Sequence, residues 1–269
     1  MTNKESLRSC TLDELHVDDE ASMKAVPVYA DLKTVLLRAG HRFRVLPAGS
    51  VRWDRALLLN LTFWGGDGGD VLPEDRIAAD VVAHVAWHHL AARALPPADG
   101  GLALSVDALF LGEAIASAFD VYLVGRLLGT QRKRSPRSSF LETQVPAMAE
   151  SASAAGLDER AFEALLGTIA AAPERSFEQL RSLLVDVASG LHGCVDAADG
   201  LAVLQAHEDH PFAPLLHRYE LSNWVLWARA WAPDRCAPDE AARAVDASLR
   251  AAPDALAWLT TTWLRPLVA

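Results

Sequence analysis

The amino-acid sequence predicts a mostly α-helical protein, in which a small N-terminal β element precedes a multi-helix bundle containing an antiparallel helix pair. Two observations predict this fold. From Pro73 almost to the C-terminus, apolar residues recur at helical spacing between Pro, Gly and acidic residues that suit helix ends. Before that point, only residues 42–46 and 56–64 show the alternating or aromatic-rich pattern of strands.

Composition excludes several classes of protein. The 269 residues are 51% hydrophobic and 22% charged, which excludes disorder over the whole length. The formal net charge of −10 argues against nucleic-acid or membrane binding. Three scattered cysteines cannot form a disulfide framework or a Cys-type zinc site. With no apolar signal core near the N-terminus, we expect a soluble, cytoplasmic protein.

The N-terminal half is expected to contain several short elements. Residues 1–25 are polar and acidic, which predicts a flexible arm. Residues 26–40 have helical spacing and end at a glycine, and the two strands 42–46 and 56–64 follow. The glycine-rich run 65–70 is interpreted as a loop, because it lacks the spacing of a phosphate-binding motif.

Helices are expected through the rest of the chain. Residues 73–95 start with Pro and acids and stop before two prolines, and residues 105–129 run from a Ser to a Gly. Together with the β element they form a region 26–130, which a basic linker at 131–139 separates from a C-terminal helical region, 140–269, expected to pack on it. That region is predicted to have helices near 140–155, 158–171, 175–189, 197–207, 212–231, 237–251 and 253–265.

The helix pair carries a polar seam. Asp80, His84 and His88 are spaced i, i+4 and i+8, which places them along one stripe of the first helix. Glu113 and Asp120 share a face of the second helix. Counting from the short connection at about 1.5 Å per residue puts His88 level with Glu113, and Asp80 level with Asp120. Both matches favour an antiparallel hairpin with these side chains facing each other.

Such a seam can bind a metal ion. Buried His, Glu and Asp side chains are costly unless they are paired or hold a cation. The set His84, His88 and Glu113 suits Zn²⁺, or alternatively Fe²⁺ with open positions. Asp80 and Asp120 would then orient the imidazoles. A metal-free structural polar network and a set of unrelated exposed residues remain as alternatives.

These motifs resemble the gluzincin metallopeptidases, which have HExxH on one helix and a ligand Glu on the next. Here the motifs read HVAWH from His84 to His88 and GEAIA around Glu113, within a resemblance that covers residues 42–128. The resemblance implies zinc-dependent hydrolysis, with Val85 standing where the family has its general base. Val85 should then line the cavity beside the metal, and Asp80 or Asp120 could replace the base.

Two further groups of residues lie later in the chain. His217 and Tyr219 are candidates for stabilising an oxyanion over the metal. Trp224, Trp227 and Trp231 repeat at helical spacing, which predicts a core or interface stripe.

A divergent metal-dependent enzyme is the favoured function, acting on a small-molecule or peptide substrate by Lewis-acid or water-activating chemistry. The first alternative is a catalytically silent, gluzincin-like binding or scaffold protein. The second is a helical non-haem iron oxygenase in which Asp80 joins the ligands. The sequence does not predict the oligomeric state.

Overall fold

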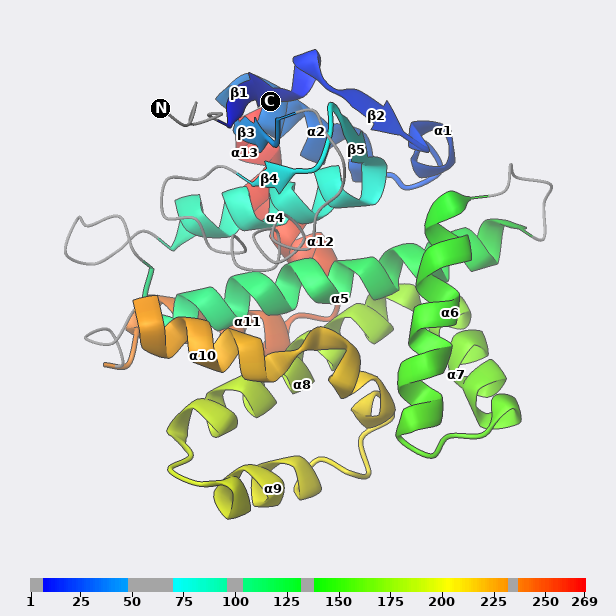
Figure 1. Ribbon diagram of the computed structural model, residues 1–269, viewed down its shortest axis with the longest axis vertical. Helices are drawn as coiled ribbons and strands as arrows, with labels where there is room; N and C mark the ends of the chain where they lie inside the picture. Colours follow the sequence, from blue (N-terminus) through cyan, green and yellow to red (C-terminus); the bar gives the residue numbers. More distant parts are fainter. Residues whose placement is uncertain (1–6, 48–69, 96–103, 132–137, 232–236) are drawn as a thin grey trace, which may run out of the picture.

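The computed structural model describes residues 7–47, 70–95, 104–131, 138–231 and 237–269. Within these ranges the protein is mostly helical, with short strands confined to its N-terminal part, which confirms the predicted fold class. The strands and the first helices lie at one end of the molecule, and the longest helix runs through its middle (Figure 1).

Residues 8–23 form ordered structure where the sequence predicts a flexible arm. They contain strand β1 (Arg8–Thr11), the short helix η1 (Leu12–Glu14), strand β2 (His16–Asp18) and helix α1 (Glu20–Met23). The reason for the difference is that this polar segment carries a few apolar side chains at the right places. Cys10, Leu12 and Met23 are each at most 2% exposed and belong to the hydrophobic core.

Two small sheets organise the N-terminal part. One has the order β1-β3-β4, with β3 (Arg42–Val45) antiparallel to β1 and parallel to β4 (Val71–Leu72). The other pairs β2 in parallel with β5 (Arg76–Ala78). Strand β3 confirms the prediction for residues 42–46. The predicted strand 56–64 and the glycine-rich residues 65–69 lie outside the described residues.

The first helix of the predicted pair starts later than expected. The sequence places its start at Pro73, but residues 76–78 are β5 and helix α4 spans Ala79–Ala94. Pairing with β2 outweighs the helical tendency of this acidic, Pro-led segment, and an ion pair between Arg76 and Asp18 joins the two strands. Helix α2 (Tyr29–Ala39) packs on α4 from the side of the sheets.

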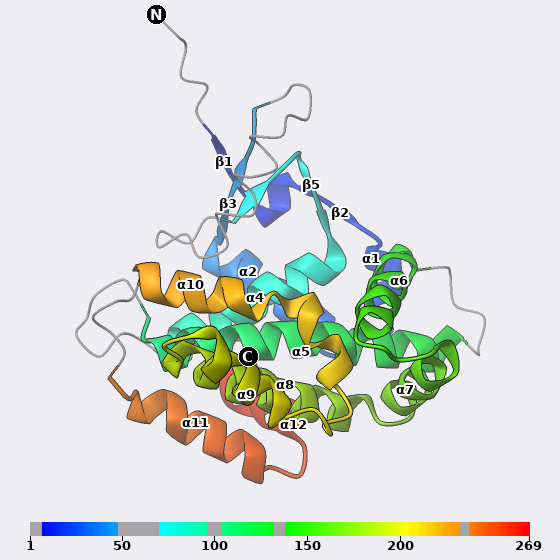
Figure 2. The same cartoon turned by 60° about the horizontal axis from the view of Figure 1, so that its bottom comes forward.

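Helix α5 (Val106–Gln131) is the centre of the protein. It packs against α4 on one side and against helices of the C-terminal region on the other (Figures 1 and 2). By length and composition it could cross a membrane, but 89% of its most apolar window is buried inside the protein, as expected for a core helix.

The remaining elements surround α5 and cover the segments predicted to be helical beyond residue 139, but the predicted helix 212–231 is broken at Glu220 and the predicted helix 253–265 is divided into three short elements. They are α6 (Ser139–Ala154), α7 (Glu159–Ala171), α8 (Pro173–Gly193), α9 (Ala197–Gln205), η2 (Ala213–Tyr219), α10 (Leu221–Trp231), α11 (Glu240–Ala251), α12 (Ala255–Leu259), η3 (Thr260–Leu264) and α13 (Arg265–Val268). Helix α8 makes the most extensive contact with α5, while α10 lies across the same face of the molecule as α4 and α5.

A close approach between α4 and α5 holds the predicted seam together. A Cβ atom built at Gly112 would lie 3.3 Å from Cβ of Ala91, so the two helices meet there through their smallest side chains. This contact lies next to Glu113 in the chain. Small residues at the crossing therefore bring the polar side chains of α4 and α5 within reach of one another.

Candidate metal centre

His84, His88 and Glu113 converge as the sequence predicts. One potential ligand atom from each lies within 4.8 Å of the other two. Nε2 of His84 is 3.2 Å from Nε2 of His88, which in turn is 2.7 Å from Oε2 of Glu113. The two histidines occupy successive turns of α4, so their rings lean together at a centroid separation of 4.9 Å.

Glu113 is the buried member of this cluster. Its side chain is 1% exposed, and neither carboxylate oxygen accepts a well-oriented hydrogen bond from any described residue. Burial opposes ionisation, but His88, followed by His84, outweighs that effect and holds the pKa of Glu113 below its ordinary value. A buried anion facing two imidazole nitrogens is the donor set that a divalent cation requires.

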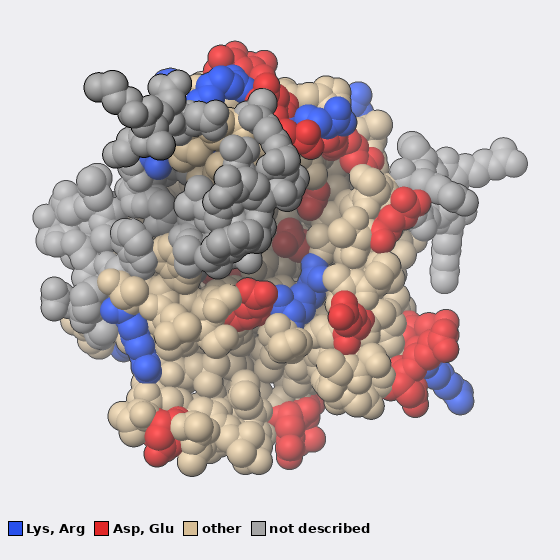
Figure 3. Space-filling model, in the orientation of Figure 1, with Lys and Arg blue, Asp and Glu red and all other residues tan. Residues whose placement is uncertain are grey.

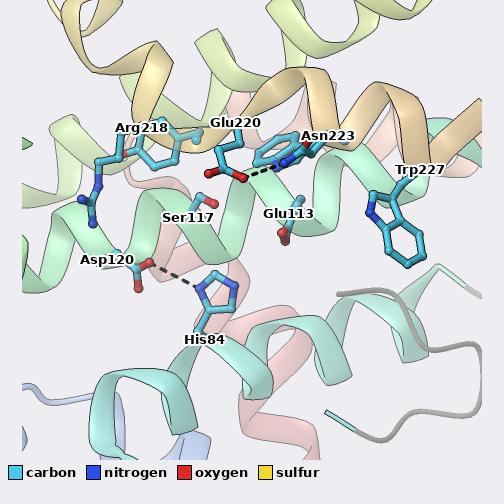
Figure 4. Close-up of a pocket in the computed structure, with 10 residues that line it drawn as sticks. His84, Glu113, Ser117, Asp120, Arg218, Glu220, Asn223 and Trp227 are labelled. Carbon is cyan, nitrogen blue, oxygen red and sulfur yellow. Dashed lines mark hydrogen bonds and ion pairs between the residues drawn. The ribbon is translucent and has the colours of Figure 1, made fainter. Parts of the chain in front are cut away.

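Asp120 orients His84 from the second helix. Its Oδ2 lies 3.4 Å from Nδ1 of His84, on the side of the ring opposite the cluster (Figure 4). Burial would lower the pKa of His84, but Asp120, ahead of Glu113 and Asp70, raises it to about 9. A carboxylate that accepts the Nδ1 proton directs Nε2 toward the cluster, where a metal ion would displace the second proton of the ring.

Asp80 lies farther along the same seam. Its carboxyl is not among the converging ligand atoms, and the negative charge of Asp120 repels the ionised form of the Asp80 carboxyl. Burial, followed by this repulsion, raises the pKa of Asp80 to about 6. The structure therefore separates the two predicted aspartates: Asp120 contacts a candidate ligand, whereas Asp80 acts on the cluster only through its charge.

Asp70 is an acidic neighbour that sequence reasoning missed. Its Oδ2 lies 3.0 Å from Nε2 of His41, and burial of the carboxyl is outweighed by this contact and by His88, which lower its pKa. The ring of His41 packs edge-on against His89 at 5.7 Å. His89 thus faces away from the cluster, as its position on the helix predicts. The one sequence signal for Asp70 is its position directly before strand β4, where a polar side chain can lie at the edge of the sheet.

A cavity of about 390 Å³ opens beside the candidate ligands. Its first wall consists of His84 from α4 and Glu113, Ser117 and Asp120 from α5. Acidic and basic side chains lie close together in the recess near the middle of this face (Figure 3).

The second wall of the cavity comes from a segment about a hundred residues later. It is formed by η2, α10 and the turn between them, through Arg218, Tyr219, Glu220, Asn223, Trp224 and Trp227. Figure 4 shows the labelled members of this wall opposite His84 and Asp120, with Arg218 and Trp227 at its two ends. Helical spacing predicts a core or interface stripe for the tryptophans, but Trp224 and Trp227 line the cavity. The side chain of Trp231 lies outside the described residues.

The two predicted oxyanion-stabilising residues differ in position. Tyr219 lines the cavity and is 9% exposed. Its hydroxyl makes no well-oriented hydrogen bond with a described residue, although Arg218 lies close enough to interact with it. Burial raises its pKa, so the hydroxyl remains a proton donor. His217 is exposed and does not line the cavity. Of these two residues, Tyr219 is the one whose position in the cavity wall allows it to contact a bound molecule.

The turn between η2 and α10 is fixed by an unusual residue. Glu220 has φ 48° and ψ 45°, a left-handed conformation that costs a side-chain-bearing residue about 1–2 kcal/mol. Its carboxylate accepts a hydrogen bond of 2.6 Å from Nδ2 of Asn223, and its carbonyl oxygen accepts one of 2.7 Å from the Asn223 amide. Strained residues of this kind cluster at functional sites.

Val85 is not where the family resemblance would put it. It is 4% exposed, belongs to the hydrophobic core and does not line the cavity. The expectation that it borders the candidate metal is therefore wrong. Because the next residue on a helix is rotated by about 100°, the side chain of Val85 points away from that of His84 and into the packed interior.

Fold and site together define a helical protein with a possible metal-binding His-His-Glu cluster between two core helices. No protein-family model matches the chain, and neither a curated protein nor a solved structure shows significant similarity to it.

Proposed function

We propose that the protein is a divergent metal-dependent enzyme in which His84, His88 and Glu113 hold Zn²⁺, or alternatively Fe²⁺. The observation that carries this proposal is the buried carboxylate of Glu113, 2.7 Å from His88 Nε2 and without a well-oriented hydrogen bond from the described residues. A buried carboxylate that faces two imidazole nitrogens is a place where a divalent cation would be stabilised. Two nitrogens and one oxygen are a common ligand set for catalytic zinc and for non-haem iron.

A metal held here would supply Lewis-acid chemistry: polarisation of a substrate carbonyl, or a lower pKa for a bound water. The chain's own residues supply the rest. Asp120 accepts the Nδ1 proton of His84 and keeps its Nε2 directed at the metal. Tyr219, across the cavity, offers a hydroxyl proton to an oxygen of the substrate.

Asp120 is also the best candidate for moving a proton. It lines the cavity, whereas Asp80 does not, and its side chain is 24% exposed and so accessible to a substrate or to water. The gluzincin resemblance remains part of the proposal in a weakened form. A relative that has lost the usual base at Val85 would need a base from another element, and Asp120 would serve.

A catalytically silent binding protein is the second candidate, and the burial of Val85 favours it. With an apolar residue packed in the core at the family's base position, the helix pair could hold a metal for structural purposes alone. The iron oxygenase with Asp80 as a fourth ligand has less support, because the Asp80 carboxyl does not join the converging atoms.

Metal analysis of protein purified without an affinity tag tests the proposal. We expect about one zinc or iron per chain, lost in a His84→Ala, His88→Ala double variant. His89→Ala is the matched control, because His89 lies on the same helix but packs against His41. Wild-type protein with no bound metal, and with a melting temperature that ignores added zinc and iron, would overturn the proposal.

Turnover then separates the enzyme from the silent protein. Ester and amide probes small enough for the cavity should be hydrolysed by the metal-loaded wild type and not by the double variant. Full metal occupancy without turnover of any probe would favour the binding protein.

A further inference from the structure

We propose that the cavity binds a small substrate by an anionic group, a carboxylate or a phosphate, through Arg218 and Tyr219. The inference rests on the proposed function, because it names the class of substrate that the same site would take. It depends on three features of the second wall: an arginine that makes no ion pair with a described residue, a buried hydroxyl without a well-oriented hydrogen bond from those residues, and two indole rings.

Arg218 provides a positive charge that is not compensated in the described part of the chain. Its guanidinium donates a hydrogen bond to the side-chain oxygen of Gln144, which is neutral. No ion pair joins Arg218 to a carboxylate of any residue that the structure describes. An arginine in a cavity wall presents several N–H donors in a planar fork that matches a carboxylate or a phosphate.

The carboxylates of the cavity are engaged elsewhere. Glu113 lies against His88 and Asp120 against His84, and both carboxylates therefore face a histidine. Glu220 is exposed to solvent and accepts a hydrogen bond from the neutral Asn223, whereas Arg218, in the same wall, makes no ion pair with any residue that the structure describes. A substrate that completes the charge balance at Arg218 is therefore an anion and not a cation.

Tyr219 adds a second donor next to Arg218 in the chain. It is more than nine-tenths buried, and burying a hydroxyl without a partner costs about 1–3 kcal/mol. Such a group is expected where a ligand supplies the missing acceptor. The left-handed turn at Glu220 directly follows and leads into α10, so one short segment supplies the donors and the rings beyond them.

Trp224 and Trp227 indicate the remainder of the ligand. Both line the cavity from α10, and Trp227 lies at the end opposite Arg218 (Figure 4). Indole faces stabilise flat or apolar groups. The site therefore fits a small molecule with an oxyanion at one end and an apolar body.

The test compares probes of one shape and different charge. Binding of 3-phenylpropionate, its neutral amide 3-phenylpropionamide, and phenethyl phosphate is followed by tryptophan-indole NMR signals of the full-length protein, with and without zinc. We expect the anions to bind about tenfold or more tightly than the amide, because hydrogen bonds to charged groups are the stronger ones. The tighter of the two anions assigns the group as carboxylate or phosphate.

Matched variants then locate the binding site. Arg218→Met should remove the preference for the anions, whereas Arg229→Met removes a positive charge from α10 outside the cavity and should retain it. Tyr219→Phe should weaken anion binding several-fold without lowering the melting temperature, because its hydroxyl makes no well-oriented hydrogen bond with a described residue. Tyr29→Phe, which removes another buried hydroxyl of the same kind, should leave binding unchanged.

Equal binding of acid and amide, binding of no probe, or full anion preference in Arg218→Met would each overturn the inference. The outcome is separable from that of the proposed function. Anion binding that needs Arg218, in a protein shown to bind neither zinc nor iron, would refute the metalloenzyme alone. A metal-loaded protein that does not distinguish acid from amide would refute the anionic substrate alone.

Discussion

Removing Glu113 alone should harm the protein more than removing the whole cluster. In Glu113→Ala, His84 and His88 would lose the buried carboxylate that lies 2.7 Å from His88 Nε2. Truncating one partner of a buried charged pair costs about 3–5 kcal/mol. For a chain of this size, about 2–4 °C of melting temperature corresponds to each kcal/mol, so we expect a fall of about 6–20 °C in the presence of EDTA.

The triple variant His84→Leu, His88→Leu, Glu113→Met should not lower the melting temperature, in contrast to Glu113→Ala. It replaces all three polar groups by apolar side chains of similar size, so no charge within the cluster is left without a partner. Asp120 loses His84, but its side chain is 24% exposed and its charge stays accessible to water. Such replacements are neutral or stabilising by about 1–4 kcal/mol. We therefore expect a melting temperature in EDTA equal to or above that of the wild type, and complete loss of the metal response.

The assay is thermal unfolding with EDTA and with excess zinc. At a zinc concentration about 100 times Kd, binding should stabilise the wild type by about 2.7 kcal/mol, or about 5–11 °C. Glu163→Ala is the control for losing a glutamate, because Glu163 is exposed on α7. A triple variant as unstable as Glu113→Ala would refute the reasoning and show that the cluster is a polar network that the fold itself requires.

Two further predictions concern the elements around the cluster. Asp120→Ala should weaken zinc affinity by about 10–100-fold in a competitive chelator titration while the protein stays folded, because it removes the acceptor for Nδ1 of His84. Unchanged affinity would mean that this contact does not orient the ring. Gly125→Ala should lower stability in urea by about 1–3 kcal/mol, because its Cβ would lie 2.5 Å from the carbonyl oxygen of Ile169. Gly167→Ala, with open space around the new Cβ, should raise it by about 0.5–1 kcal/mol.

The helix pair could be predicted from the sequence because its determinants are local. Histidines four residues apart share a helix face whatever the rest of the chain does. A short connection fixes which residues of the next helix lie opposite, and the contacts of His88 with Glu113 and of His84 with Asp120 run in the antiparallel sense. The ligand cluster therefore follows from spacing alone.

The second wall of the cavity could not be predicted in this way. Residues 218–227 reach the site only because η2 and α10 pack beside α5, about a hundred residues after Glu113. Helical spacing of Trp224 and Trp227 indicates an apolar face, but it does not distinguish a core from a cavity wall. Strand β5 was missed for a similar reason, since its partner β2 lies about sixty residues earlier.

The two walls of the cavity differ in how firmly they are tied to the rest of the protein. Glu113, Ser117 and Asp120 project from α5, which contacts most of the other long helices, so changes there disturb the whole interior. The opposite wall is one continuous segment, 218–227, with exposed positions such as Leu226 between its lining residues. If the cavity binds a ligand, substitutions in this segment would alter which molecule is recognised while the candidate metal ligands stay in place. New specificities should therefore be easiest to evolve, or to select from a library, by varying residues 218–227 and leaving α4 and α5 untouched.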